Sequence, residues 1–130
     1  AYGKRASASA SWNYQVDDQG IYQSFGDDVY CWHAGGDYGK WLPYRNSNSI
    51  GIEMCINQDG NYDGAMHQDA KLIAHLMHQY NLTFDNVVRH HDTSGKICPN
   101  YMIETNRYSE FLGKVKDITK AKEYTENIAT

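Results

Sequence analysis

The stretch Ser49-Ile50-Gly51-Ile52-Glu53-Met54-Cys55-Ile56 decides how we expect this chain to fold. It is mostly apolar and rich in β-branched residues, and this pattern predicts a buried strand. Glu53 interrupts the apolar run, and burying a carboxylate is costly unless it is paired or ligated. Either Glu53 is a catalytic carboxylate, or it occupies an edge or polar face of a half-buried strand.

The segments before this strand predict a β-hairpin. Trp12–Val16 and Ile21–Phe25 alternate apolar and polar residues, and the four residues between them have turn chemistry. Residues 6–11 are small and of low complexity, so we expect a flexible lead-in. Residues 34–48 are rich in Gly, Asn, Ser and aromatic side chains and predict a long loop, which in a small domain is more often functional than idle.

The segments after the strand predict two helices and one further strand. Residues 65–80 have helical spacing, with an apolar face of Leu72, Ile73, Leu76, Met77 and Tyr80. We expect the opposite face to point to solvent; it carries His67, His75 and His78. Residues 87–90 predict a strand and residues 101–116 a helix. This order of elements indicates an α/β domain, a mixed sheet flanked by helices.

Size and composition favour one globular domain. The chain has 130 residues, 41% of them hydrophobic and 22% charged, which excludes a disordered chain. We expect a domain over residues 1–116 and a tail or linker over residues 117–130. A net charge of −4 argues against nucleic acid as a partner, and no apolar run approaches the ~20 residues of a membrane span. The cysteine count is odd, which argues against a complete disulfide framework, although Cys31 and Cys55 could still pair.

The stretch Arg89–Pro99 carries the strongest chemical pattern. His90 and Cys98 have side chains that suit zinc, and Lys96 places a positive charge beside them. We prefer His90 over His91 as the ligand because Asp92 lies two residues on and can orient its ring. The spacing alone also allows a structural interpretation, in which the histidine is an ordinary surface residue, the cysteine a small core residue and the lysine a solvated loop residue.

The loop entry supplies candidate binding residues. His33 follows Trp32 where the long loop begins, so it lines a binding cleft or packs within the loop. Aromatic rings gather in the same region, and such rings stack on sugar faces or fill cores. They are Trp32, Tyr38, Trp41 and Tyr44.

Four motifs in one order resemble the type 2 N-acetylmuramoyl-L-alanine amidases, zinc hydrolases of peptidoglycan from phage endolysins and bacterial autolysins that are related to peptidoglycan recognition proteins. The matching motifs are Ser11–Asp18, Trp32–Gly35, Asn48–Glu53, and His90–Asp92 with Lys96–Pro99. The resemblance covers roughly residues 6–112.

The resemblance implies a mixed, twisted sheet flanked by helices and a role for each motif residue. His90 and Cys98 are then ligands of Zn²⁺, Glu53 is the catalytic acid that orients or deprotonates the zinc-bound water, and Lys96 stabilises the oxyanion. The attacked bond is the amide between N-acetylmuramic acid and L-alanine. The expected substrate-binding residues are His33, Trp32, Trp12 and Asn13.

Two departures from the family pattern bear on these roles. The family carries another zinc-ligating His on a strand that precedes the segment beginning at Ala1, and catalytic zinc usually has three protein ligands. We therefore expect the third ligand, and the strand that carries it, upstream of Ala1. The family also usually has His at the position of Asn13, which cannot titrate.

The leading hypothesis is a zinc-dependent amidase that acts on the bacterial cell wall, secreted or released from a phage-infected cell. Its partner is bacterial peptidoglycan, and the tail leaves room for a cell-wall-binding domain after it. The alternative is a peptidoglycan-binding module of the same fold that no longer hydrolyses. A closed structural zinc domain is disfavoured, since no second Cys or His pair has suitable spacing.

Overall fold

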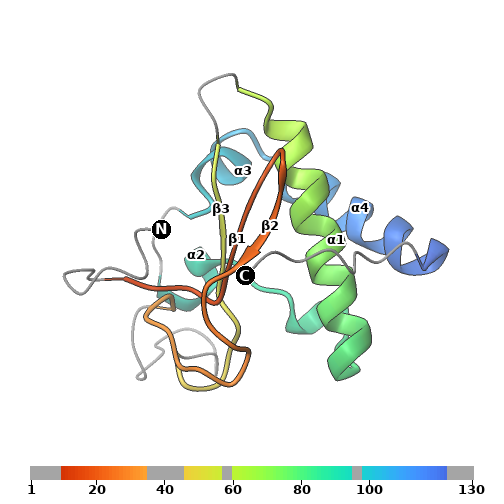
Figure 1. The fold of residues 1–130 in the computed structure, drawn as a ribbon. Coiled ribbons are helices and arrows are strands. Elements are labelled where there is room, and N and C mark those ends of the chain that lie inside the picture. Colours follow the sequence, from red (N-terminus) through yellow and green to blue (C-terminus); the bar gives the residue numbers. More distant parts are fainter. Residues whose placement is uncertain (1–9, 35–45, 57–59, 95–97, 123–130) are drawn as a thin grey trace.

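The computed structural model describes residues 10–34, 46–56, 60–94 and 98–122. A mixed three-stranded sheet lies beside one long helix, with shorter helices beyond it (Figure 1). The strand order is β2-β1-β3, where β1 is Tyr14–Asp17, β2 is Gly20–Gln23 and β3 is Ile52–Met54. The expected mixed sheet with flanking helices is confirmed.

The predicted hairpin is present as β1 and β2. The strands pair antiparallel, with Val16 opposite Ile21, and both side chains are buried. Asp17 closes the turn, because its Oδ1 accepts hydrogen bonds from the backbone N–H groups of Gln19 (2.8 Å) and Gly20 (3.0 Å). β3 pairs parallel to β1 with Glu53 opposite Gln15, so the sheet holds the predicted carboxylate next to the hairpin.

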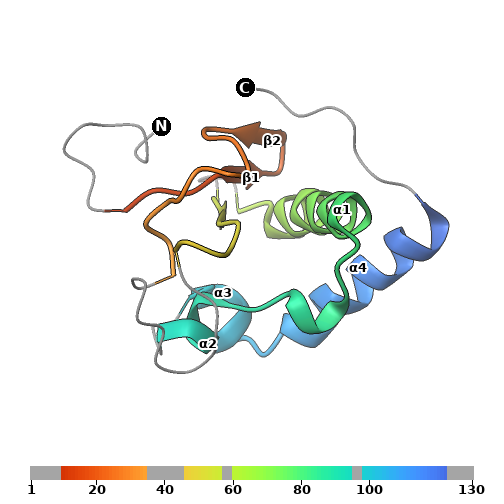
Figure 2. The ribbon, with the colours of Figure 1, turned by 90° about the horizontal axis from the view of Figure 1, so that it is seen from below.

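The long helix α1, Tyr62–Tyr80, organises the core because two of its sides are buried. One side, with Leu72 and Leu76, packs on Tyr14, Val16 and Ile21 of the sheet. The other side packs on α4, Tyr108–Ala121, and the cluster there includes Met66, Ala70, Ala74, Met77, Phe111, Val115 and Ile118. Figure 2 shows the hairpin and the short helices on opposite sides, with α1 beside both.

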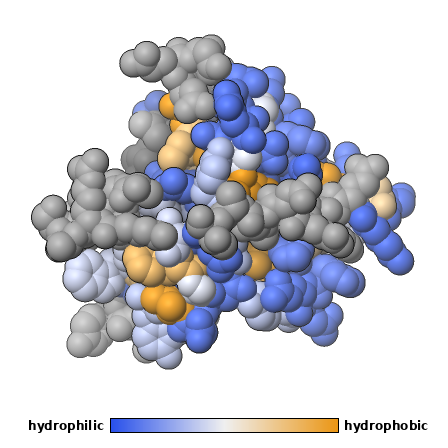
Figure 3. Space-filling view, viewed as in Figure 1, coloured by the Kyte–Doolittle hydropathy of each residue, from blue (hydrophilic) through white to orange (hydrophobic). Residues whose placement is uncertain are grey.

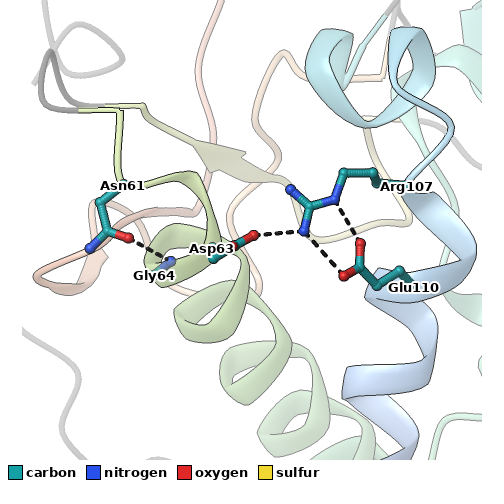
Figure 4. Close-up of polar contacts among 5 residues, drawn as sticks. All are labelled: Asn61, Asp63, Gly64, Arg107 and Glu110. Carbon is teal, nitrogen blue, oxygen red and sulfur yellow. Dashed lines mark hydrogen bonds and ion pairs between the residues drawn. The ribbon is translucent and has the colours of Figure 1, made fainter.

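Charged and capping groups fix where α1 and α4 begin. Asn61 caps α1 by accepting a hydrogen bond from the Gly64 N–H at 3.1 Å. Arg107 precedes α4 and reaches Asp63 at the start of α1 as well as Glu110, each at 2.6 Å (Figure 4). This bridge joins the starts of two helices that are far apart in the sequence.

The predicted helix over residues 65–80 is confirmed and begins three residues earlier, at Tyr62. Most of its predicted apolar face is covered, but Tyr80 is 43% exposed at the end of the helix. The Tyr80 hydroxyl instead donates to Asp27, which also accepts from Tyr14. His67 and His78 are exposed, as expected, and His75 is partly exposed.

Two predicted elements near the C-terminus are wrong. Residues 87–89 form no strand, since no neighbouring strand pairs with them, and the helix α2, His90–Ser94, begins at the fourth position. The single helix expected over residues 101–116 is two helices, α3 (Asn100–Glu104) and α4. Between them Asn106 adopts a left-handed conformation (φ 57°), which ends α3.

Three further expectations concern boundaries and cysteines. The tail predicted from residue 117 begins inside α4, and Ile118 is buried in the core, so the domain continues to residue 121. Cys55, expected inside a buried strand, follows β3 and is exposed. Cys31, Cys55 and Cys98 form no disulfide with one another, so the pairing of Cys31 with Cys55 is not present.

The surface is consistent with these burial patterns. Hydrophilic residues predominate on the face shown in Figure 3, and apolar residues form small patches. Among the described residues, no helix is both long enough and apolar enough to span a membrane.

Candidate active site

A cleft of about 460 Å³ lies between the sheet, α1 and the short helices. β3, α1, the segment before α2, α3 and α4 all contribute residues to its lining. Five of the predicted site residues line it: Trp12, His33, Glu53, His90 and Cys98. The fold therefore gathers residues that lie up to 86 positions apart in the sequence into one site.

Glu53 reaches this cleft from the middle of β3. Its two neighbours in the strand, Ile52 and Met54, pack against the hydrophobic core, and Glu53 itself is half-buried. The parallel pairing with β1 fixes its position along the sheet. Glu53 thus occupies a half-buried edge strand and also lines the cleft, so its position is compatible with both sequence-based interpretations.

His90 and Cys98 line the same cleft as Glu53. His90 is the first residue of α2, and the backbone N–H of His91 donates to the carbonyl of Cys98 at 3.0 Å. This bond places the backbone of Cys98 beside the start of α2. An imidazole and a thiol at adjoining backbone positions are a suitable donor pair for Zn²⁺.

Asp92 orients the start of α2 through Arg89. Its carboxylate accepts from the Arg89 backbone N–H (2.8 Å) and from the guanidinium at 2.7 Å and 3.0 Å. These hydrogen bonds hold the pKa of Asp92 below its ordinary value. Asp92, expected to orient His90 directly, is thus engaged by Arg89, one residue before His90.

His33 is held in the cleft by two loops. Its backbone N–H donates to the Asn46 Oδ1 (3.0 Å), and its ring Nε2 lies 2.9 Å from the Ser49 hydroxyl. Burial lowers the pKa of His33 to about 4, so the ring is neutral near pH 7. Gly51 allows this arrangement, since a Cβ there would lie 2.5 Å from the His33 ring.

Asn13 lies beneath the cleft rather than in it. The side chain is fully buried, and its amide donates to the carbonyls of Gly26 (2.8 Å) and Val29 (3.1 Å). Its Oδ1 accepts from the Gly51 N–H at 2.9 Å. Asn13 therefore joins the hairpin, the loop after it and the segment before β3, and a direct contact with substrate would require this network to open.

The two tryptophans differ in their placement. Trp12 lines the cleft, and its Nε1 donates to Gln15 at 3.2 Å. Trp32 is 62% exposed and lies outside the cleft lining, with its backbone held by Ser11. Its ring is free to meet a ligand that extends beyond the cleft. Lys96, Tyr38, Trp41 and Tyr44 lie outside the described residues.

Two residues of the site were missed in the sequence. Asn46 is buried and accepts from the backbone N–H groups of His33 and Ala34, which shapes the loop entry. Asp69 of α1 is also buried and lines the cleft. The burial of Asp69 could have been predicted from the sequence, because Asp69 has the helical spacing of the buried face that includes Leu72, Ile73 and Leu76.

The cleft contains the types of side chain that bind zinc, but fewer of them than a catalytic zinc site usually has. His90 and Cys98 supply two suitable ligands, whereas the described residues contain no group of three potential ligands from His, Cys, Asp and Glu. A catalytic zinc usually has three protein ligands and one open position. The imidazole and the thiol suit zinc, and a third protein ligand would have to come from outside the described residues.

Comparison with known proteins agrees with this geometry. Residues 1–101 match the family model described as N-acetylmuramoyl-L-alanine amidase. The chain is 39% identical over 104 residues to the N-acetylmuramoyl-L-alanine amidase XlyA of Bacillus subtilis (strain 168), covering 80% of this chain and 34% of that protein. It is 38% identical over 113 residues to CwlH of the same organism, covering 86% and 43%. The chain thus spans less than half the length of these curated relatives.

Solved structures show the same fold. The catalytic domain of XlyA superposes with a TM-score of 0.75 at 37% identity, covering 86% of this chain and 69% of that one. The structure of PlyL gives a TM-score of 0.71 at 30% identity, covering 80% and 64%. From the family match, these similarities and the residues gathered in the cleft, we conclude that this chain belongs to the N-acetylmuramoyl-L-alanine amidase family.

Proposed function

We propose that this chain is the catalytic domain of a zinc-dependent peptidoglycan amidase, which cleaves the amide between N-acetylmuramic acid and L-alanine. One observation carries the proposal: Glu53, His90 and Cys98 line the same cleft. A carboxylate facing an imidazole and a thiol suits hydrolysis of an amide. The family membership supports the same reaction and substrate class.

Each residue has a role in this proposal. His90 and Cys98 hold the metal, together with a ligand outside the described residues. When bound, zinc supplies Lewis-acid chemistry and lowers the pKa of a coordinated water. Glu53 accepts the proton of the attacking water and passes it to the leaving amine. Lys96, by the family resemblance, stabilises the negative charge that develops on the carbonyl oxygen.

The neutral state of His33 suits a substrate-binding role. With its pKa near 4, the buried ring adds no positive charge to the cleft at neutral pH, and it is kept in place by Ser49. A neutral imidazole both donates and accepts hydrogen bonds, as do the amide groups of a peptide stem. Trp12, inside the cleft, and exposed Trp32 offer ring faces for the sugar.

The test is hydrolysis of purified cell walls by the full-length protein that includes this chain, with and without a chelator and with zinc added back. We expect a fall in turbidity and release of new L-alanine amino termini, with no new reducing sugar ends. Chelation should abolish both signals, and zinc should restore them. New reducing ends without new amino termini would show cleavage of the glycan and overturn the proposed bond.

A second candidate is a peptidoglycan-binding module without hydrolysis. The observation in its favour is the two-ligand metal set among the described residues. Co-sedimentation of the chain with cell walls, combined with an unchanged turbidity at saturating zinc, would support this candidate. The variant Glu53→Gln serves as a control. If it lost both clearing and wall binding, the variant would be misfolded, and circular dichroism of the variant checks its fold.

The site of action follows from the substrate. An enzyme that cleaves peptidoglycan works at the bacterial cell wall, and we propose that this chain reaches it by secretion or by release from a phage-infected cell. A cell-wall-binding domain joined after the tail would raise its local concentration there. Fusing such a domain to the chain should lower the enzyme concentration needed for clearing.

A further inference from the structure

Asp69 is a buried carboxyl group that the proposed reaction leaves without a role. It lies on α1, in the middle of the helix, and only 8% of the residue is exposed. Its Oδ1 is fully buried and has no hydrogen-bond partner among the described residues. Since an unpaired buried polar group is costly, a partnerless carboxyl oxygen on a core helix requires an explanation.

The position of Asp69 provides one, because it lines the same cleft as Glu53. α1 packs against β3, so the two carboxyl groups face the cleft from neighbouring elements. Two carboxylates that face each other in a poorly solvated site cannot both ionise readily. Asp69 is the more buried of the two, since Glu53 is only half-buried, and therefore Asp69 loses more solvation on ionising.

We propose that Asp69 is a positioning residue for Glu53: the two carboxyl groups hold one proton between them, it resides on Asp69, and Glu53 is the ionised partner. This inference rests on the proposed function only in taking Glu53 as the base. Asp69 does not touch the reacting atoms. It keeps the cleft to one carboxylate charge and leaves that charge where the attacking water is expected.

The electrostatics of the surroundings support this division. Burial, and then the charge of Glu53, raise the pKa of Asp69 to about 7. Tyr108 of α4 also interacts with the charge of Asp69, and it stays neutral near pH 7 because burial raises its pKa to about 12. Further titratable groups line the cleft: His33, Tyr80, Arg89, His90 and Cys98.

The first test reads the proton directly. The chain is labelled with ¹³C at its carboxyl groups, and the Asp69 signal is followed through a pH titration in the unmodified chain and in Glu53→Gln. We expect Asp69 to titrate near neutral pH in the unmodified chain and at lower pH in Glu53→Gln, where the neighbouring charge is gone. An Asp69 midpoint in the ordinary carboxyl range, or one that Glu53→Gln leaves unchanged, would overturn the proposal. This measurement does not depend on activity, so it stands even if the proposed hydrolysis fails.

The second test is the pH profile of wall hydrolysis in Asp69→Asn and Asp69→Leu. Asparagine keeps the shape and a hydrogen-bond donor but cannot ionise, so we expect Asp69→Asn to remain active and to lose the rate change near pH 7. Asp69→Leu should lower the rate at every pH without altering its metal content. A purely structural role predicts lower stability with an unchanged profile, and that result in Asp69→Asn would contradict the inference.

Discussion

The two sides of the cleft are built in different ways. On the hairpin side, residues 11–14, 31–34 and 46–54, polar contacts join distant segments: Gly51 accepts from the backbone N–H groups of Asn13 and Tyr14, each at 3.0 Å. On the α2 side, residues 86–92 and 98–99, the ion pair between Arg89 and Asp92 is local, since the two residues are three positions apart. Glu53 thus lies in a region held by contacts between distant segments, whereas His90 lies beside an ion pair between near neighbours in the sequence.

This difference indicates which side of the cleft is more rigid. Contacts between distant segments open only when much of the domain unfolds, whereas local contacts open with their own segment. The α2 side is tied to the rest of the fold by Tyr108, whose hydroxyl reaches Val87 and whose ring lies 5.0 Å from the Arg89 guanidinium carbon. We therefore expect a preformed base on one side and a more adaptable metal-binding segment on the other.

The largest expected effect separates the chemistry of the two sides. Glu53→Gln should lower the rate of wall hydrolysis by about 10²–10⁴-fold, the usual contribution of an acid–base group, and leave the zinc content unchanged. Cys98→Ser should lower both the rate and the zinc content, because a ligand is weakened. Elemental analysis beside the turbidity assay checks this. Cys31→Ser, at a buried thiol outside the cleft, is the matched control; full metal content and activity in Cys98→Ser would contradict the ligand assignment.

The next effect is the dependence of stability on pH that the buried Asp69 causes. Its pKa of about 7 lies above the ordinary value of 3.8, so the unfolded chain ionises first as pH rises. The folded state is then favoured at low pH, and that advantage is lost between these two values. Relative to Asp69→Asn, the unmodified chain should lose up to about 4 kcal/mol of unfolding free energy across this window. Urea unfolding at about pH 4 and about pH 8 measures this change in unfolding free energy. If the unfolding free energies of the two proteins changed equally between these pH values, the prediction would be refuted.

A smaller effect tests the framework on the hairpin side. Asn13→Asp preserves the shape but turns a donor toward the carbonyls of Gly26 and Val29 into an acceptor. We expect a loss of about 3 kcal/mol or more in unfolding free energy, because two buried carbonyls lose their partner and face a charged oxygen. Chemical denaturation measures it. Gln19→Glu makes the same change at an exposed turn residue and should stay within about 0.5 kcal/mol of the unmodified chain.

The smallest effect concerns the α2 side. Arg89→Ala removes an ion pair whose side chains are 25% and 27% exposed, so we expect a global loss of only about 1 kcal/mol. Because Arg89 holds the pKa of Asp92 low, this contribution is present above the ordinary carboxyl range and is lost as pH falls through the lowered value. Hydrogen exchange should show faster opening at His91 and Asp92 than at β1. Equal protection of the two sides would remove the contrast between them.

Local pattern made part of the fold predictable. The hairpin follows from alternating residues around the turn at Asp17, and α1 follows from its helical spacing. The motif positions likewise indicated which residues would meet: Glu53, His90 and Cys98 line one cleft. These features depend on short-range periodicity and residue chemistry, which a sequence displays directly.

Other features were not predictable, for physical reasons. The break at Asn106 requires a left-handed residue that helical spacing does not reveal, and residues 87–89 had strand character without a strand to pair with. The apolar face of α1 gave no sign that Tyr80 would turn to Asp27. These outcomes depend on backbone conformation and on which segments meet in the fold, and local propensity does not specify either.

The hairpin, the long helix, the family and the residue types of the site could be inferred before folding was considered, because each depends on the identity and spacing of nearby residues. The burial of Asn13 beneath the cleft and the position of Asp69 in the same cleft as Glu53 became visible only in the folded chain. Burial and the pairing of charges arise from segments that meet through folding, and solvation at such meeting points sets which groups are charged.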